Sequence, residues 1–244
     1  MADNRLSGRT CVLTGGGGGI GQALAVRLAQ AGMNIVLLGG NRVEKLQVTA
    51  KLTEKYAECR VIPGDLTDWD LLDAAVKTAA EAFGTIDVLI NNAGTAQNTP
   101  FAEITAQEYD KIMNLNCRVP FLLCQKFLPY LEKSSVPAIV NIASVVAHSG
   151  YPFQSVYSAS KHALLGFTKS LAREYYQKGI RVHAVSPGGV FTDMVKVSRP
   201  DLSSEGMILP EDVAEAVYFL LSSRTCAVID EIQLHRCGKE PFTV

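Results

Sequence analysis

Tyr157 and Lys161, four positions apart in the stretch YSASK, form the pair in this chain best suited to moving a proton. On a helix, residues at this spacing share one face, so the phenol and the ammonium would lie together. A phenol has a pKa of about 10, which makes it a poor base at neutral pH. Lowering that pKa by about 2 units requires about 2.7 kcal/mol, much of which a close, partly desolvated cation could supply. Taken alone, such a pair is more often a core tyrosine and a surface lysine.

Ser144 stands thirteen residues before Tyr157, at the end of an apolar run, where its hydroxyl could meet the same site. A second chemical signal is the stretch TCVLTGGGGGIGQALA, residues 10–25, which lies between a predicted strand and a predicted helix. A helix start offers unpaired N–H groups and the positive end of a dipole, which suit a diphosphate. Glycine allows positive φ and leaves no Cβ in the way of a phosphate. The run therefore predicts a dinucleotide cradle, with a simple tight turn as the alternative.

Five consecutive glycines exceed what such a cradle requires. Thr14, Gly15, Gly19 and Gly21 fall at the spacing T-G-x-x-x-G-x-G. The glycines at 16–18 occupy the variable positions, which we expect to be permitted rather than required. The sequence lacks the G-K-S or G-K-T ending of a P-loop, which argues against an NTPase. NNAG, residues 91–94, follows a predicted strand directly, and on its own it could be a plain turn.

The elements that must position these residues alternate along the chain. Apolar runs of strand length are followed by amphipathic segments of helix length, which predicts a parallel sheet covered on both faces. We expect one doubly wound α/β domain spanning 1–244, with a bend at Pro120 and a substrate loop at about 189–209, inside the long irregular stretch 186–209. The predicted strands are 11–14, 34–38, 59–65, 86–94, 138–144, 180–188 and 231–235. The predicted helices are 19–32, 42–56, 70–84, 105–131, 156–178 and 210–222.

Composition excludes several classes of protein. The net charge of −1 offers no positive field for nucleic acid or an acidic membrane. No apolar run approaches the roughly 18 residues that span a bilayer, and the first ten residues lack the apolar core of a signal peptide. The six cysteines form no C-x-x-C pair, and the four histidines show no metal-site spacing. These features predict a cytoplasmic protein with free thiols and no metal.

Five motifs in order make the chain resemble the short-chain dehydrogenase/reductases, in their compact single-domain branch. The resemblance covers about residues 8–237, and each motif is modest alone. They are T-G-x-x-x-G-I-G (14–21), G-D-L (64–66), N-N-A-G (91–94), the set of Ser144, Tyr157 and Lys161, and P-G-G-V-x-T (187–192). The resemblance implies a Rossmann-like fold and hydride transfer between a nicotinamide dinucleotide and a carbonyl or secondary alcohol substrate.

The resemblance also implies roles for individual residues. Tyr157 would be the general acid/base, Ser144 would donate to the substrate oxygen, and Lys161 would lower the pKa of Tyr157 and hold the nicotinamide ribose. Asn116 would support a water relay to Lys161. Asp65 would receive the adenine amino group. The other residues implied to contact the cofactor are Gly15, Gly19, Ile20, Gly21, Leu66, Asn91, Ala93, Gly94, Pro187, Gly188, Val190 and Thr192. The positions expected near the substrate are Val145, Val146, His148, Tyr151, Phe153, Gln154, Gly189, Val190 and Met194.

The cofactor's 2′ group is normally contacted just after the second strand, where an acid would bond a hydroxyl and repel a phosphate. Here Gly39 stands at that position, and no acid appears before Glu44. Arg42 is near enough in sequence to meet a phosphate, which favours NADP over NAD. Arg42 could also be an ordinary residue of a first helical turn.

Two other functions are open. A dinucleotide-binding regulatory or scaffold protein would keep this fold without turnover, although it would be expected to lose Ser144, Tyr157 or Lys161. An extended-branch epimerase or dehydratase would need a C-terminal substrate domain, for which about 80 residues after Lys161 leave no room. Relatives commonly pair their two long helices, here 105–131 and 156–178, so a homo-oligomer such as a tetramer is expected.

Overall fold

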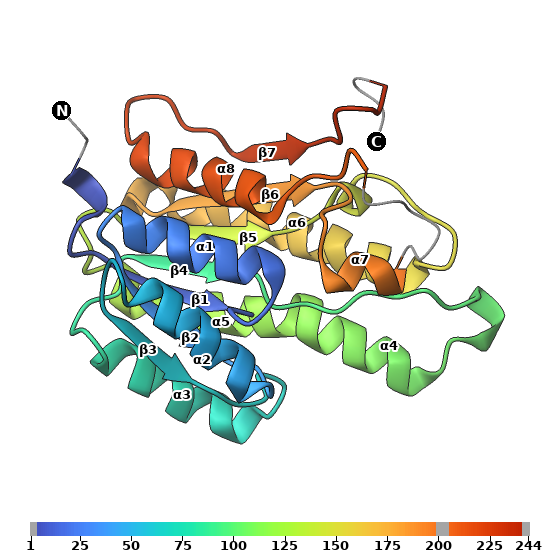
Figure 1. Cartoon of the computed structure of the whole chain (residues 1–244), viewed down its shortest axis with the longest axis horizontal. Coiled ribbons are helices and arrows are strands. Elements are labelled where there is room, and N and C mark those ends of the chain that lie inside the picture. Colours follow the sequence, from blue (N-terminus) through green and yellow to red (C-terminus); the bar gives the residue numbers. More distant parts are fainter. Residues whose placement is uncertain (1–3, 199–204, 241–244) are drawn as a thin grey trace.

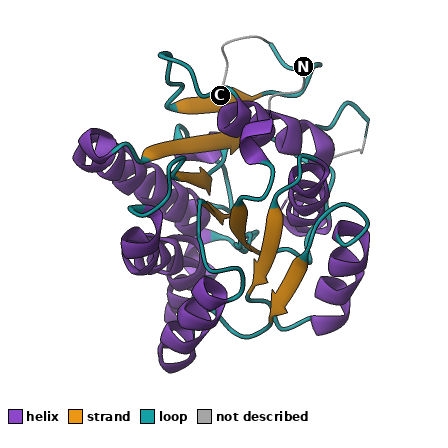
Figure 2. Ribbon diagram, turned by 90° about the vertical axis from the view of Figure 1, so that its left-hand side faces the viewer, coloured by secondary structure: helices purple, strands orange, loops and turns teal. Residues whose placement is uncertain are grey.

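The centre of the molecule is a sheet of seven parallel strands in the order β3-β2-β1-β4-β5-β6-β7 (Figures 1 and 2). The computed structural model describes residues 4–198 and 205–240. The strands are β1 (Thr10–Thr14), β2 (Asn34–Leu38), β3 (Cys59–Ile62), β4 (Val88–Asn91), β5 (Ala138–Ile142), β6 (Arg181–Pro187) and β7 (Glu231–Leu234). This is the predicted doubly wound fold, and the strand order reverses at β1, which pairs with both β2 and β4.

Helices cover both faces of the sheet, as Figure 2 shows. They are α1 (Gly19–Gln30), α2 (Val43–Thr53), α3 (Trp69–Glu81), α4 (Ala106–Met113), α5 (Val119–Leu131), α6 (Ser155–Tyr175), α7 (Asp193–Ser198) and α8 (Pro210–Ser222). Cys11 and Leu13 of β1 pack with α1, α2 and α8, whereas Val12 packs with α3 and α5 on the other face. The strand residues are apolar on both faces because helices bury each face.

The predicted helix 105–131 is divided into α4 and α5 by a π-helical turn, Asn114–Arg118. The regular α-helix is therefore interrupted just before Pro120, the residue at which the sequence predicted a bend. Proline has no N–H to donate to the carbonyl four residues earlier, which belongs to Asn116, so regular α-helical bonding cannot continue there. The irregular turn places Asn116, which is buried, beneath the site described below.

The stretch 186–209, predicted to be irregular, contains regular structure. β6 extends to Pro187, and the short helix α7 lies inside the stretch. Val190 forms a parallel bridge with Ile208, which joins the beginning of the stretch to its end. Residues 199–204 of the predicted substrate loop lie outside the described residues.

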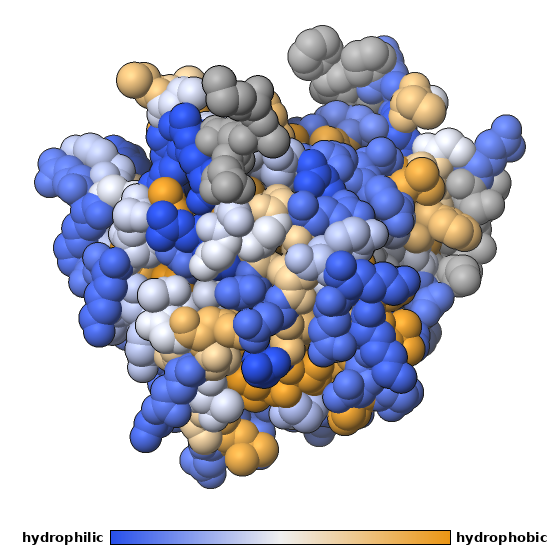
Figure 3. Space-filling view, turned by 60° about the vertical axis from the view of Figure 1, so that its left-hand side comes forward, coloured by the Kyte–Doolittle hydropathy of each residue, from blue (hydrophilic) through white to orange (hydrophobic). Residues whose placement is uncertain are grey.

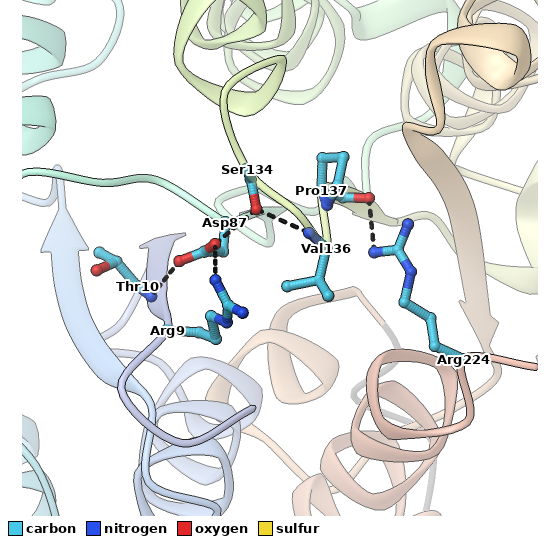
Figure 4. Close-up of polar contacts among 7 residues, drawn as sticks. All are labelled: Arg9, Thr10, Asp87, Ser134, Val136, Pro137 and Arg224. Carbon is cyan, nitrogen blue, oxygen red and sulfur yellow. Dashed lines mark hydrogen bonds and ion pairs between the residues drawn. The ribbon is translucent and has the colours of Figure 1, made fainter. Parts of the chain in front are cut away.

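A closed set of polar contacts surrounds Asp87, just before β4 (Figure 4). Its carboxylate accepts hydrogen bonds from Thr10 N at 2.9 Å and from Ser134 Oγ at 2.5 Å, and Arg9 Nη1 lies 3.4 Å away. Ser134 Oγ also accepts from the N–H of Val136 at 3.1 Å. These contacts join the amino ends of β1, β4 and β5 at the edge opposite the strands' carboxyl ends.

The surface in Figure 3 is mostly hydrophilic, with hydrophobic residues gathered in smaller patches toward its lower middle. No helix among the described residues combines the length and the apolar character needed to cross a bilayer.

Candidate active site

A cleft of about 720 Å³ lies at the carboxyl ends of the strands. Its position at the reversal of strand order is where open α/β sheets bind ligands. Most residues predicted from the sequence line it together: Gly15, Gly19, Ile20, Gly21, Arg42, Asp65, Leu66, Ala93, Gly94, Ser144, Tyr157, Lys161, Pro187, Gly188, Val190 and Thr192. Asn91 and Asn116 are not among the lining residues.

The glycine turn between β1 and α1 is packed too closely for side chains. A Cβ at Gly21 would lie 2.2 Å from the carbonyl oxygen of Gly15, and one at Gly15 would lie 2.9 Å from Ala93 Cα. Gly15 also has a φ of +70°. The bare backbone and the start of α1 thus face the cleft, which fits a diphosphate. Gly16 is more constrained than predicted, because a Cβ there would lie 2.7 Å from Leu37 Cδ2.

Asn92, which is not among the residues predicted from the sequence, joins the glycine turn to the end of β4. Its side-chain amide donates to the carbonyl oxygens of Thr14 at 3.1 Å and Gly15 at 3.2 Å. Thr14 Oγ1 accepts from the N–H groups of Asn92 and Ala93, each at 3.0 Å. Asn92 belongs to the NNAG motif, which directly follows β4. Its place in that motif was the signal by which the sequence could have identified it.

Asn91 faces the interior of the protein and not the cleft. It is 2% exposed, and its amide donates to Asn141 Oδ1 at 2.8 Å and approaches Cys124 Sγ at 3.4 Å. The side chain of Asn91 is therefore not placed to make the cofactor contact that the resemblance implies, whereas Ala93 and Gly94 line the cleft. The reason is that Asn91 still belongs to β4, where its amide packs between β5 and α5.

Ser144 and Tyr157 meet in the cleft from different elements. Ser144 follows β5, and its hydroxyl accepts from the N–H of Val146 and donates to the carbonyl of Pro187, both at 3.3 Å. Tyr157 lies in the first turn of α6. Burial raises the pKa of Tyr157, and its hydrogen bond with Ser144 acts in the opposite direction. The net direction differs from the lowered pKa that the sequence predicted, because desolvation disfavours the phenolate.

Lys161 lies on the same face of α6 as Tyr157, as the spacing predicted. Its Nζ is 6.0 Å from the centre of the Tyr157 ring and donates to the carbonyl oxygen of Ile142 at 2.8 Å. The residue is only 5% exposed. Burial lowers the pKa of Lys161 to about 8, while the neighbouring Cys117 acts in the opposite direction. The side chain remains mostly protonated at pH 7.

Asn116 is fully buried and holds the chain that follows NNAG. Its Oδ1 accepts from the N–H of Thr95 at 2.8 Å, and its Nδ2 donates to the Thr95 carbonyl at 2.9 Å. Nδ2 also lies 3.1 Å from Ser160 Oγ. Asn116 Oδ1 is near the backbone of Gly94, where an added Cβ would lie 3.2 Å away. Its direct contacts are thus with backbone and with α6, beneath the cleft.

The chain after β2 forms the other end of the cleft. Gly39 has a φ of +79°, and a Cβ there would lie 2.4 Å from Leu66 Cγ. The N–H groups of Gly39 and Gly40 donate to the carbonyls of Ile62 at 2.8 Å and Gly64 at 2.7 Å. Neither N–H is available to an added phosphate, whereas the cationic side chains of Arg42 and Lys45 line this end of the cleft.

Charged groups frame this end of the cleft. The hydrogen bonds from the backbone and side chain of Thr67, the largest influence, lower the pKa of Asp65, and the Asn41 side chain adds to the effect. Arg42, at the N-cap of α2, and Lys45 both line the cleft. Lys45 Nζ lies 3.3 Å from a carboxylate oxygen of Asp193.

Two positions expected near the substrate do not reach the cleft. His148 Nε2 lies 2.7 Å from Glu231 Oε1, and Phe153 is 55% exposed with a φ of +64°. The other seven expected positions line the cleft, and so do three residues after β7 whose role the sequence did not indicate: His235, Arg236 and Lys239.

Comparison with known proteins adds independent observations. The family model for short chain dehydrogenase matches residues 9–203. The 3-oxoacyl-(acyl-carrier-protein) reductase FabG of Thermotoga maritima is 33% identical over 245 residues, covering 93% of this chain and 96% of that protein. A short chain dehydrogenase from Mycobacterium paratuberculosis bound to NAD superposes with a TM-score of 0.85 at 27% identity, covering 94% of this chain and 97% of that one. One from Burkholderia cenocepacia in complex with NADP gives 0.84 at 30% identity, with the same coverage.

Proposed function

The chain belongs to the short-chain dehydrogenase/reductase family of oxidoreductases, and from this premise we propose that it transfers a hydride between NADP(H) or NAD(H) and a small carbonyl or secondary alcohol substrate. The observation that carries the proposal is the convergence of Ser144, Tyr157 and Lys161 on the cleft that the glycine turn enters. The bare glycine turn fits the diphosphate of such a cofactor, and Asp65 fits its adenine end. A bound nicotinamide supplies or accepts the hydride.

The protein's own part is to place the carbonyl and to move one proton. In reduction, Tyr157 donates its phenolic proton to the carbonyl oxygen as the carbonyl carbon gains the hydride, which gives the alcohol. Ser144 Oγ, which donates to Pro187 O in this structure, would turn its proton to the same oxygen and stabilise the developing charge. Lys161, protonated at pH 7, would stabilise the phenolate that remains.

We also propose a preference for NADP(H). Arg42 lines the cleft beside Gly39, so this end offers a guanidinium and no carboxylate at the position where an acid would repel a 2′-phosphate. Backbone binding of the phosphate by Gly39 and Gly40 is disfavoured because both N–H groups already have partners. Arg42 is therefore the side chain that we expect to decide the preference.

The proposal is tested by assaying a panel of ketones, aldehydes and secondary alcohols with NADPH, NADH and their oxidised forms. Turnover of a carbonyl compound with stoichiometric loss of the reduced cofactor is the expected result. Tight cofactor binding without turnover of any panel member would support the alternative, a dinucleotide-binding regulatory or scaffold protein. Retention of Ser144, Tyr157 and Lys161 in one cleft argues for the enzyme.

We propose that the chain forms a homo-oligomer through α4, α5 and α6. Phe121 on α5 is 51% exposed and makes an edge-to-face contact with Phe167 of α6, with ring centres 5.7 Å apart. Tyr109 on α4 is 48% exposed. Large rings left in water on neighbouring helices suit burial against a second copy. Light scattering at micromolar concentration should give at least twice the 26.3 kDa chain mass, whereas a monomer would contradict the proposal.

A further inference from the structure

The first turn of α6, which carries Tyr157, is capped by a side chain far away in the sequence. Gln154, the N-cap residue, makes no side-chain capping bond. Instead, Gln97 Oε1 accepts hydrogen bonds from the N–H groups of Val156 at 3.0 Å and Tyr157 at 3.2 Å. These are the second and third helical residues, whose N–H groups a capping side chain ordinarily serves. Gln97 thus bonds directly to the backbone of the tyrosine to which we assign proton transfer.

Gln97 lies in the segment that follows NNAG and is only 1% exposed. Its Nε2 is buried and has no hydrogen-bond partner among the described residues. Leaving a buried donor unpaired is unfavourable, and an apolar side chain would fill the same space without that loss. The side chain therefore accepts two hydrogen bonds from α6 while its own Nε2 stays unpaired. This arrangement points to a role for the oxygen beyond filling space.

The carbonyl side of Tyr157 is held as well, and the contacts form a ring. The Tyr157 carbonyl accepts from Ser160 Oγ at 2.7 Å, and Ser160 Oγ lies 3.1 Å from Asn116 Nδ2. The side chain of Asn116 forms hydrogen bonds with both the N–H and the C=O of Thr95, which lies two residues before Gln97. The peptide groups on both sides of Tyr157 are thereby fixed to the same short segment of chain.

We propose that Gln97 is a positioning residue for Tyr157, which acts by fixing the first turn of α6 through Oε1. The inference rests on the proposed function, since it assumes that Tyr157 transfers the proton. Gln97 is not among the residues that line the cleft, so we expect it to touch neither substrate nor cofactor. Its effect should therefore appear in the chemical step rather than in binding.

The test compares two substitutions of nearly equal size. Gln97→Met removes the acceptor, and Gln97→Glu keeps an oxygen for both N–H groups and removes the unpaired donor. A small misplacement of a reacting group can cost about 100-fold in rate, so Gln97→Met should lower kcat by about 10- to 100-fold. The cofactor KM should change by less than about threefold, and Gln97→Glu should stay within about threefold of the wild-type kcat.

Thr168→Val is the matched control for loss of a buried hydrogen bond in the same helix. Thr168, eleven residues after Tyr157, is 3% exposed, accepts from Asn141 Nδ2 at 2.8 Å and donates to the carbonyl of Leu164 at 2.6 Å. Urea unfolding of all variants shows how far each one destabilises the fold. Amide hydrogen exchange at Val156 and Tyr157, which does not depend on activity, should be faster in Gln97→Met than in the wild type or in Thr168→Val.

Three results would overturn the proposal. Gln97→Met could keep its kcat within twofold, it could lose no more activity than Thr168→Val at equal loss of stability, or Gln97→Glu could be as slow as Gln97→Met. A wild type without carbonyl turnover, or a fully active Tyr157→Phe variant, would instead refute the proposed function. In that event, faster amide exchange at Val156 and Tyr157 in Gln97→Met would still show that Gln97 caps α6, although the cap would have no catalytic consequence.

Discussion

Two buried polar clusters lie at opposite edges of the same sheet, and they are built differently. At the amino edge, the Asp87 carboxylate is surrounded by donors from Arg9, Thr10 and Ser134 (Figure 4), and Asp87 is only 1% exposed. At the carboxyl edge, Tyr157 and Lys161 face a cleft, and burial shifts the pKa of each toward its neutral form.

The difference teaches how to separate a structural cluster from a chemical one. The Asp87 cluster joins the ends of strands, and its buried carboxylate already has donors from Arg9, Thr10 and Ser134. The Tyr157 cluster is held from behind, by Asn116, Ser160 and the carbonyl of Ile142, and its ionisable ends face the cleft. Shifted pKa values in a cleft are typical of functional sites. Substitutions at the amino edge should accordingly change the free energy of unfolding, whereas substitutions at the carboxyl edge should change kcat.

The largest effect is expected from Tyr157→Phe. The variant keeps the ring and loses the hydroxyl, so the oxygen of an alcohol or ketone loses its proton partner. General acid/base catalysis contributes about 100- to 10,000-fold, and we expect a kcat loss of about 1,000-fold or more because no other side chain replaces the phenol. The dissociation constant of the cofactor, measured by fluorescence titration, should change little. Near-normal turnover would remove Tyr157 from the mechanism.

Asp87→Ala should affect stability and leave the chemistry intact. The substitution leaves the Thr10 N–H and the Ser134 hydroxyl without their buried acceptor, which should lower the free energy of unfolding by about 3 kcal/mol. Urea unfolding measures this loss, and kcat per folded molecule should match the wild type. Glu58→Gln, which breaks an exposed ion pair with Arg60, is the control and should cost under about 0.5 kcal/mol. A specific loss of kcat in Asp87→Ala would mean that the two edges are coupled.

The sequence predicted the chemical edge because local rules place its main residues. Helical spacing brings Tyr157 and Lys161 together, and the end of a strand carries Ser144 to the same edge of the sheet. The motif did not show that the side-chain amide of Asn91 packs between β5 and α5, away from the cleft. Gln97 was missed because its two partners lie about 60 positions away, and no local pattern indicates a cap made across that distance.

The nucleotide end of the cleft was predicted less completely. The sequence showed that Gly39 and Gly40 bring no side chain, but it could not show that their N–H groups pair with the chain around β3. It also could not show that Leu66 fills the space beside Gly39. A carboxylate introduced at Gly39 would therefore test backbone strain together with cofactor choice, and Arg42 is the better position for an experiment.

Arg42→Ala should separate the two cofactors at the exposed end of the cleft. A charge-assisted contact with a 2′-phosphate is worth about 1.5–3 kcal/mol, so the dissociation constant of NADPH should rise about 10- to 150-fold while that of NADH stays almost unchanged. Both constants must be measured at one salt concentration because screening weakens this contact. Lys51→Ala is the control, since Lys51 is an exposed cation on α2 that does not line the cleft. Tighter binding of NADH than NADPH by the wild type would refute the NADP preference.

The smallest effect concerns the pH dependence of stability, and it tests whether the ammonium of Lys161 is truly desolvated. Burial lowers the pKa of Lys161 from 10.5 to about 8 in the folded protein. Between these values the unfolded chain binds one more proton at this residue than the folded protein does, so the contribution of Lys161 to stability rises with pH. From pH 7 to pH 9.5 the gain should be about 2 kcal/mol.

The measurement is urea unfolding of the wild type and Lys161→Met, and the quantity compared is the difference between their free energies of unfolding. Both proteins carry the additional substitution Cys117→Ser, because the Cys117 thiol interacts with Lys161 and would titrate differently without it. Other titrations, such as those of the fully buried thiols of Cys11 and Cys124, occur in both proteins and largely cancel in this difference. The window ends below the raised pKa of Tyr157. A difference that stays flat between pH 7 and pH 9.5 would show that Lys161 keeps its ordinary pKa, and the contrast between the closed amino edge and the ionisable carboxyl edge would then rest on Tyr157 alone.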